Sequence, residues 1–278
     1  MSASQVSEHM ATDSSDLDRR CEVLRSLHAP GTPLMLANAW DAASARAVVA
    51  AGFPAVATTS GGVAATLGYE DHEHAPSDEM LAAAGRIARS VDVPVTVDAE
   101  AGYGTEPADL VAALQDAGAA GCNLEDTNHG AGELRDPESH AVWLRAVRGA
   151  ANTAHYPLVI NARIDVFLSA LLAGSDTPQR ELLPDGLRRA RAYLDAGVDC
   201  VFPIALWEVD ALREFVSGAP GPVNILKTPR APSLSELAEL GVARISYGSL
   251  LHHGVMEQFG GVLRSIASEA APTGTAES

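Results

Sequence analysis

The stretch PVTVDAEAGYGTEPADLVAALQDAGAAGCNLED, residues 94–126, contains the pattern that decides the fold. An apolar, β-branched run over Pro94–Asp98 precedes a glycine-containing loop, an alanine- and leucine-rich segment over Pro107–Ala117, and a second apolar run over Gly121–Glu125. Both runs are nearly continuous in apolar residues, which is typical of strands buried on both faces of a parallel sheet. Proline at the start of the middle segment and Gly118 just after it are start and stop signals of a helix. The stretch therefore predicts a strand, a helix and a parallel strand.

The same order of elements recurs along the chain. Further strands are predicted at Pro33–Asn38, Ala55–Thr59, Pro157–Asn161, Cys200–Ile204, Pro222–Lys227 and Ala243–Tyr247. Further helices include those predicted at Asp78–Ser90, Pro137–Ala151 and Pro184–Ala196. Eight strand–helix units in roughly 250 residues predict a (β/α)8 barrel, an α/β fold. The alternative is an open doubly wound sheet, but no GxGxxG motif follows the first strand to open a nucleotide site.

No linker or change of composition divides the chain between its ends. Residues 1–15 and 271–278 are small, polar and unpatterned, and we expect them to be flexible tails. Residues 16–270 are expected to form a single barrel domain.

The chain of 278 residues has 19 Lys and Arg against 36 Asp and Glu, so its net charge is −17. This charge excludes nucleic acid as a partner and disfavours an anionic membrane surface, because both would repel the protein. The uncharged run over residues 47–69 is long enough to span a bilayer, but its glycines and proline predict a helix end, a strand and a loop instead. Three scattered cysteines show no zinc or disulfide spacing, and the N-terminus does not resemble a signal peptide, so a cytoplasmic location is expected.

Polar side chains follow the predicted strands, at the edge where barrel enzymes place their chemistry. Five acids come after neighbouring strands, namely Asp71, Asp98, Glu100, Glu125 and Asp126. Carboxylates gathered at one mouth repel one another unless a cation neutralises them, and Mg²⁺ prefers oxygen ligands. Arg163 ends a central strand, and its planar guanidinium suits a substrate carboxylate. Any single acid could instead cap the helix that follows it.

Two other features have structural interpretations beside the functional ones. His72 and His74 form an HxH pair that resembles a transition-metal clip, but the acidic residues around them favour a solvated surface loop. Tyr103 lies in the DAEAGYG segment, whose glycines let the backbone turn close to a ligand, and it could equally be a packed loop aromatic.

Six segments together resemble the isocitrate lyase/phosphoenolpyruvate mutase superfamily. They are NAWDAASA, TTSGGVAATLGYED, VTVDAEAGYG, GCNLED, INARIDVF and LGVARISYGS, and the resemblance runs from about Leu24 to Gly261. It implies a modified barrel whose last helix packs on a neighbouring subunit, giving homodimers or homotetramers. It also implies Mg²⁺, with Mn²⁺ as a possible substitute, and a small carboxylate substrate that passes through an enolate.

The resemblance also implies roles for particular residues. Asp98 would ligate the metal directly, while Asp71, Glu100 and Glu125 would hold its waters. Ser60 and the backbone of Gly61 and Gly62 would bind the substrate carboxylate, and Arg163 would pair with substrate charge. Tyr103 and Asn224 are further candidates for substrate contacts.

The loop after NLED departs from the family pattern. The lyases carry KKCGH or KRCGH there, with a proton-donating cysteine, and the mutases and phosphonopyruvate hydrolases carry a lysine and a TNS-like asparagine. Here residues 126–136 read DTNHGAGELRD, without cysteine or lysine. Asp71 or His129 would then manage the proton, with Asn128 and Arg163 completing the predicted catalytic set.

These features predict a Mg²⁺-dependent lyase that cleaves a carbon–carbon bond of a small 2-oxo or 2-hydroxy dicarboxylate, by retro-aldol cleavage or decarboxylation. Two alternatives stay open. One is phosphorus–carbon chemistry, as in a phosphonomutase or a phosphonopyruvate hydrolase, and the other is a barrel that binds a carboxylate without turnover.

Overall fold

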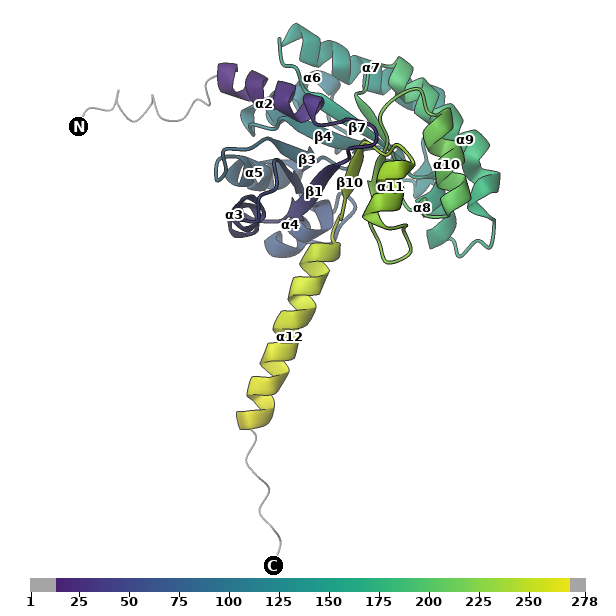
Figure 1. Cartoon of the computed structure of the whole chain (residues 1–278). Coiled ribbons are helices and arrows are strands. Elements are labelled where there is room, and N and C mark those ends of the chain that lie inside the picture. Colours follow the sequence, from purple (N-terminus) through teal and green to yellow (C-terminus); the bar gives the residue numbers. More distant parts are fainter. Residues whose placement is uncertain (1–13, 271–278) are drawn as a thin grey trace, which may run out of the picture.

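Eight short parallel strands form the centre of the molecule, shown by a computed structural model that describes residues 14–270 (Figure 1). They are β1 Leu34–Ala39, β2 Val56–Thr58, β3 Val95–Asp98, β4 Gly121–Glu125, β7 Val159–Ile164, β8 Cys200–Pro203, β9 Asn224–Leu226 and β10 Arg244–Ser246. The strands pair in the order β8-β7-β4-β3-β2-β1-β10-β9, and a parallel bridge between Val201 and Val223 joins the two ends of the sheet. The (β/α)8 barrel is therefore confirmed, with each strand within a few residues of its predicted position.

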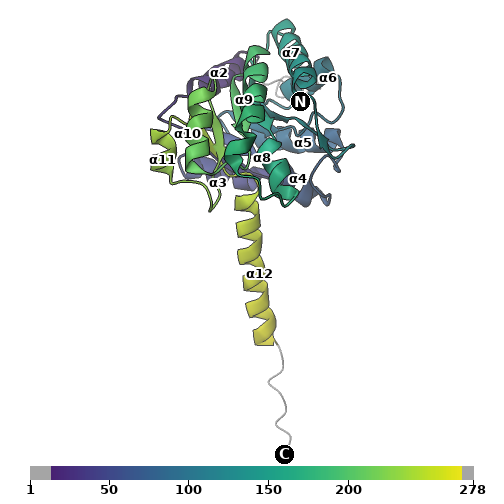
Figure 2. The same cartoon turned by 90° about the vertical axis from the view of Figure 1, so that its right-hand side faces the viewer.

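Helices cover the outside of the barrel (Figures 1 and 2). They are α2 Ser14–Ser26, α3 Ala42–Ala50, α4 Ser60–Leu67, α5 Ser77–Ala88, α6 Pro107–Asp116, α7 Pro137–Thr153, α8 Val166–Leu172, α9 Gln179–Asp195, α10 Val209–Gly218 and α11 Leu234–Glu239. The helix predicted from Pro184 begins five residues earlier, and Pro184 lies inside it. The capping box of Ser233 and Glu236 forms at the start of α11.

The last helix, α12 over Leu250–Ala270, projects away from the barrel in both views (Figures 1 and 2). Because α2 begins at Ser14, the predicted domain start at residue 16 falls within a helix. The rest of the predicted N-terminal tail and all of the C-terminal tail lie outside the described residues.

Two local differences from prediction matter for the site. The uncharged run over residues 47–69 was expected to end in a loop, but Ser60 instead begins α4. After β4, a small antiparallel hairpin of β5 Thr127–Asn128 and β6 Glu133–Leu134 occupies what was expected to be an irregular loop. None of the helices within residues 14–270 is long and apolar enough to cross a bilayer.

Candidate active site

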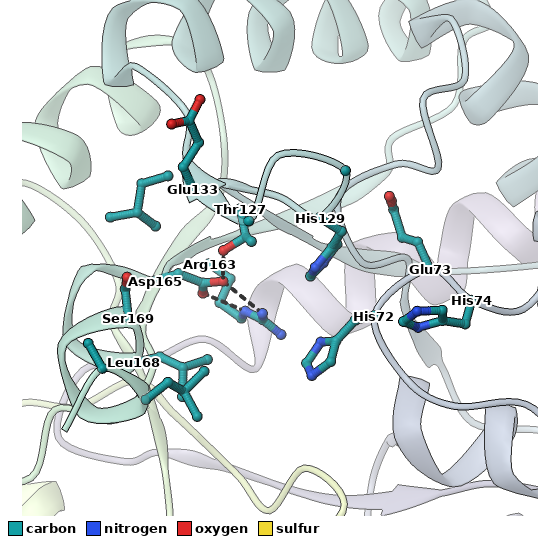
Figure 3. A pocket seen from close by; sticks show the side chains of 15 residues that line it. His72, Glu73, His74, Thr127, His129, Glu133, Arg163, Asp165, Leu168 and Ser169 are labelled. Carbon is teal, nitrogen blue, oxygen red and sulfur yellow. Dashed lines mark hydrogen bonds and ion pairs between the residues drawn. The ribbon is translucent and has the colours of Figure 1, made fainter.

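Seven of the eight strands, together with Thr59 and Ser60 just after β2, contribute residues to a cavity of about 250 Å³ at the carboxyl ends of the strands, called the mouth cavity below. Its polar lining includes Asn38, Ser60, Asp71, Asp98, Asn123, Arg163 and Ser246. A second cavity of about 800 Å³, the outer cavity, is lined by His72, Glu73, His74, Thr127, His129, Arg163, Asp165 and Leu168, among others (Figure 3). His72, Arg163 and Leu168 line both cavities, so the two adjoin.

Two carboxylates of the mouth cavity have an oxygen without a partner. Asp98 Oδ2 accepts a hydrogen bond from the Ser60 backbone N–H at 3.0 Å, and the Asp98 backbone N–H donates to Thr58 Oγ1 at 2.8 Å. Within the described residues, Asp98 Oδ1 and Asp71 Oδ1 are buried and lack any hydrogen-bond donor. A buried carboxylate oxygen is costly to leave unpaired, so these two atoms indicate a place for a cation.

The predicted carboxylate-binding segment forms the first turn of α4 rather than a loop. A Cβ on Gly61 would lie 2.8 Å from Asp71 Oδ2 and 2.9 Å from Ser249 Oγ, and one on Gly62 would lie 2.7 Å from Thr59 Cγ2. Gly61 therefore lets this turn approach Asp71 closely, and Gly62 lets it pack tightly on Thr59 and Trp40. Ser60 lines the mouth cavity, as expected of a residue that could meet a substrate.

Glu100 and Tyr103 lie beside the mouth cavity and line neither cavity. Glu100 Oε2 accepts from the Glu73 backbone N–H at 2.5 Å, and Glu73 Oε1 accepts from the Tyr103 backbone N–H at 2.6 Å. Burial and the nearby Asp98 charge raise the pKa of Glu100 to about 8. Tyr103 packs against the apolar core, which matches the packed-aromatic interpretation rather than a substrate contact.

Both oxygens of Glu125 are held by the protein. Oε1 lies 2.5 Å from His129 Nε2 and Oε2 lies 2.5 Å from Arg163 Nη1, and the Glu125 side chain is only 2% exposed. Burial raises the pKa of Glu125, although Arg163 and His129 oppose that shift. The bond to Glu125 raises the pKa of His129 in turn. Glu125 therefore holds Arg163 and His129 in place, which differs from its predicted role of holding metal-bound waters.

Arg163 reaches both cavities with much of its hydrogen-bonding capacity already used. Its Nε and Nη2 donate to Asp165 Oδ1 and Oδ2 at 2.7 and 2.8 Å, and the Thr127 hydroxyl donates to Asp165 Oδ2 at 2.5 Å (Figure 3). Burial opposes ionisation of Asp165, yet the Arg163 charge holds its pKa below the usual value. Because a guanidinium has five N–H donors, two N–H groups of Arg163 stay available for a substrate oxygen.

Asp126 does not belong to the acidic group at the mouth. Its Oδ2 accepts from Arg189 Nη1 at 2.8 Å and from the Tyr193 hydroxyl at 2.7 Å, while its Oδ1 accepts from the Asp165 backbone N–H at 2.9 Å. It is fully buried against α9. The prediction that five acids converge on one mouth is wrong for this residue, because a buried arginine from a distant helix neutralises it.

Asn128 and Asn224 lie away from the two cavities. Asn128 lines a separate cleft beside α7, and its Oδ1 accepts from the Ala131 backbone N–H at 3.2 Å within the hairpin. Asn224 is fully buried in the barrel, where its amide group exchanges hydrogen bonds with the Ser246 hydroxyl. Neither side chain lines the mouth cavity or the outer cavity, so their predicted roles at the substrate stay predictions.

His72 and His74 are exposed, yet both line the outer cavity. The rings of His72 and His129 lie 5.2 Å apart, and His74 Nδ1 lies 2.5 Å from the Asp71 carbonyl oxygen (Figure 3). The solvated-loop interpretation missed this placement. The sequence did contain a signal for it, because His72 and His74 closely follow Asp71, and a loop that brings Asp71 to the mouth also brings these residues there.

The donor set of the mouth cavity fits a divalent cation with few protein ligands. The described residues hold no group of three or more His, Cys, Asp or Glu arranged to hold a metal ion. Asp71 and Asp98 each offer one unpaired oxygen, and Mg²⁺ is commonly bound by one or two carboxylates while it keeps several waters. These two residues would hold the ion, and Mn²⁺ prefers the same oxygen ligands.

Comparison with known proteins agrees with this geometry. A sequence model of the family described as phosphoenolpyruvate phosphomutase matches residues 24–267. The chain belongs to this family. It therefore lies in the isocitrate lyase/phosphoenolpyruvate mutase superfamily, as the resemblance predicted. Its homologues are enzymes of that superfamily, whose members use a divalent metal ion.

Three similar proteins illustrate the sequence and structural similarity of this chain to known proteins. It is 38% identical over 227 residues to an uncharacterised protein of Mycobacterium tuberculosis, with 81% of each chain covered. It is 31% identical over 240 residues to 2-methylisocitrate lyase of Salmonella typhimurium, a match covering 80% of this chain and 79% of the relative. A crystal structure titled "putative phosphonomutase" from Burkholderia cenocepacia is 42% identical, has a TM-score of 0.84, and is matched over 99% of its length and 90% of this chain.

Proposed function

We propose that this member of the family is a Mg²⁺-dependent lyase that cleaves a carbon–carbon bond of a small 2-oxo or 2-hydroxy dicarboxylate. Retro-aldol cleavage and decarboxylation both fit. One observation carries the proposal: two unpaired carboxylate oxygens, of Asp71 and Asp98, line the same cavity as the Arg163 guanidinium. A cation on the acids and a guanidinium beside them form a receptor for a substrate with two negative groups.

The surrounding residues hold this receptor in a fixed geometry. The Ser60 N–H fixes one oxygen of Asp98, which leaves the other directed to the cation. Arg163 is hydrogen-bonded to Asp165 on one side and paired with Glu125 on the other. The free N–H groups of Arg163 therefore keep one orientation. When bound, the divalent ion supplies electrostatic stabilisation for the negative charge that develops on the substrate oxygen as the bond breaks.

His129 is the best placed residue to move a proton. It lies in the hairpin that replaces the cysteine loop of the lyases, and it lines the outer cavity next to His72. Its raised pKa keeps a larger fraction of the imidazole protonated near neutral pH than in a free histidine. Asp71, the other candidate, is directed to the cation site instead.

Turnover of a panel of 2-oxo and 2-hydroxy dicarboxylates, followed by ¹H NMR with Mg²⁺, tests the proposal. We expect Asp98→Asn and Arg163→Gln each to lower kcat/KM by about 100-fold or more, since each removes charge stabilisation at the reacting centre. Asp92→Asn, at an exposed acid before β3 at the other end of the barrel, should keep wild-type activity. Unchanged turnover in both site variants would contradict the assignment.

Phosphorus–carbon chemistry is the second candidate, because the 42% identical structure is described as a "putative phosphonomutase". The hairpin over residues 126–136 has no lysine, which argues against it. Phosphonopyruvate therefore belongs in the same panel, followed by ³¹P NMR. Formation of phosphoenolpyruvate or phosphate, without cleavage of any dicarboxylate, would favour this second candidate.

We also propose that the protein acts as a homodimer or homotetramer, in the cytoplasm, without nucleic acid or membrane partners. The three cysteines are buried and unpaired, which fits a reducing compartment. The exposed apolar side chains of α12 support association between copies.

A further inference from the structure

Arg244 is an arginine buried inside the barrel without a carboxylate partner. Its side chain is 0% exposed, and within the described residues it forms no ion pair. Nη2 donates to Asn123 Oδ1 at 3.1 Å, whereas Nε and Nη1 have no partner. Burial lowers the pKa of Arg244 to about 10, so the guanidinium stays charged at neutral pH. A buried charge that is not paired with a carboxylate costs free energy. The hydrogen bond of the Arg244 side chain to Asn123 therefore indicates what this arginine does in the barrel.

That neighbour, Asn123, lies on β4 in register with Asp98 on β3 and Asn161 on β7. Its Oδ1 accepts a second hydrogen bond, from Asn161 Nδ2 at 2.9 Å. Because a guanidinium can only donate, the atom of Asn123 that faces Arg244 must be the amide oxygen. The amide NH₂ of Asn123 then faces the other way, and Asn123 lines the mouth cavity.

The other amide side chain that lines the mouth cavity, that of Asn38, already has hydrogen-bond partners within the protein for both its nitrogen and its oxygen. Asn38 Nδ2 donates to the Thr58 carbonyl at 2.8 Å, and Asn38 Oδ1 accepts from the backbone N–H groups of Tyr247 and Gly248 at 2.9 Å each. The NH₂ of Asn123 has no such partner in the described part of the chain. It is therefore a fixed donor beside Asp98 whose acceptor has to come from outside the protein.

We propose that Asn123 binds an oxygen anion of the substrate through its NH₂ group, and that Arg244 is a positioning residue that holds and polarises this amide. A cation hydrogen-bonded to the amide oxygen makes the NH₂ a stronger donor, because hydrogen bonds in a chain polarise one another. A fixed donor at the position where negative charge develops stabilises the transition state. The proposal rests on the proposed function, since it names a further contact for the same dicarboxylate.

Binding of oxalate in the presence of Mg²⁺, measured by calorimetry on the full chain, tests the contact of Asn123. Asn123→Asp keeps the oxygen that Arg244 and Asn161 use and replaces only the cavity-facing NH₂, so the barrel should fold. We expect oxalate to bind about 10- to 100-fold more weakly, the range for a hydrogen bond to a charged group. Asn123→Leu should lose about 10-fold, and Asn152→Asp, at an exposed asparagine of α7, should bind like the wild type.

Oxalate affinity within twofold of the wild type in both Asn123 variants would overturn this inference alone. Failure of the wild-type protein to bind oxalate with Mg²⁺ would overturn the proposed function, and this inference with it. The two failures are therefore distinguishable by the wild-type titration.

The role of Arg244 is tested by a double-mutant cycle. Arg244→Met should weaken oxalate binding, Arg244→Lys should restore part of the loss, and Arg244→Met added to Asn123→Leu should cause no further loss, because Arg244 acts through Asn123. Additive losses would contradict the positioning role. If Arg244→Met does not fold, Arg244→Lys alone decides: it should bind oxalate more tightly than Asn123→Leu, and equal or weaker binding would contradict the role.

Discussion

Two histidines, His28 and His140, are buried as neutral imidazoles and line neither the mouth cavity nor the outer cavity. Burial is the main cause that lowers the pKa of His28 to about 4 and that of His140 to about 3. Both ring nitrogens of His140 lack a partner within the described residues, and its ring stacks on Trp143. An unfolded histidine takes up a proton below about pH 6.5, so both residues link stability to pH.

The two histidines should therefore lower the free energy of unfolding as the pH falls from 7 to 5, while the raised pKa values of Glu100 and Glu125 act in the opposite direction, so the histidine contribution is read from the change that a histidine variant causes. Between the folded and unfolded pKa values the unfolded chain binds more protons, so stability rises with pH there, and each histidine costs about 2 kcal/mol at pH 5. Urea unfolding at pH 5 and pH 7 measures this difference, which His140→Phe should reduce by about 2 kcal/mol. His155→Asn, at an exposed histidine, should keep the wild-type difference; an unchanged difference in His140→Phe would refute the assignment.

The sequence indicated that acidic residues lie at the mouth, but it did not indicate which carboxylates would lack a hydrogen-bond or ion-pair partner. Asp98 and Glu125 both end barrel strands, and both were predicted to serve the metal. The structure separates them by their partners, because Glu125 is neutralised by Arg163 and His129 whereas Asp98 keeps an unpaired oxygen. Such partners come from other strands or from the following hairpin, and no local pattern around either acid specifies them.

At the scale of elements, strands and long helices followed the sequence pattern closely, since burial on both faces produces continuous apolar runs. The hairpin of β5 and β6 was not predicted, because strands of two residues have no periodicity to detect. It decides the site nevertheless, since it places His129 toward the cavities and Asn128 away from them.

Helix α12 has an apolar face with nothing packed on it in the single chain. Beyond its first turn, its large exposed apolar residues are Val255, Met256, Phe259, Val262, Leu263 and Ile266, and their spacing of three and four places them along one side of the helix. Such a face on a projecting helix is typical of a subunit interface. We therefore expect the wild-type protein to sediment as a dimer or a tetramer.

Replacing Phe259 by glutamate should shift the protein toward monomers, because a charge would have to be buried in the interface. Sedimentation velocity measures this directly. Gln258→Glu, at the adjacent exposed position, adds the same charge outside the apolar face and should leave the assembly intact. A monomeric wild-type protein would contradict the proposed association.

At the scale of the whole molecule, a net charge of −17 would repel a dicarboxylate, yet the proposed substrate is one. The distribution of charge at the mouth of the barrel explains how such a substrate could still bind. Asp126, Glu125 and Asp165 are paired with arginines, so the uncompensated charge at the mouth is concentrated on Asp71 and Asp98. A divalent ion there turns an acidic cavity into an anion receptor, while the remaining acids lie mainly on the surface and favour solubility.

A crystal structure of the protein with Mg²⁺ and oxalate tests this account most directly. We predict metal density in the mouth cavity within ligand distance of Asp98 Oδ1 or Asp71 Oδ1, with oxalate beside it and within hydrogen-bond reach of Arg163. Metal bound instead by His72, His74 and His129 in the outer cavity, or oxalate bound without a metal, would contradict it.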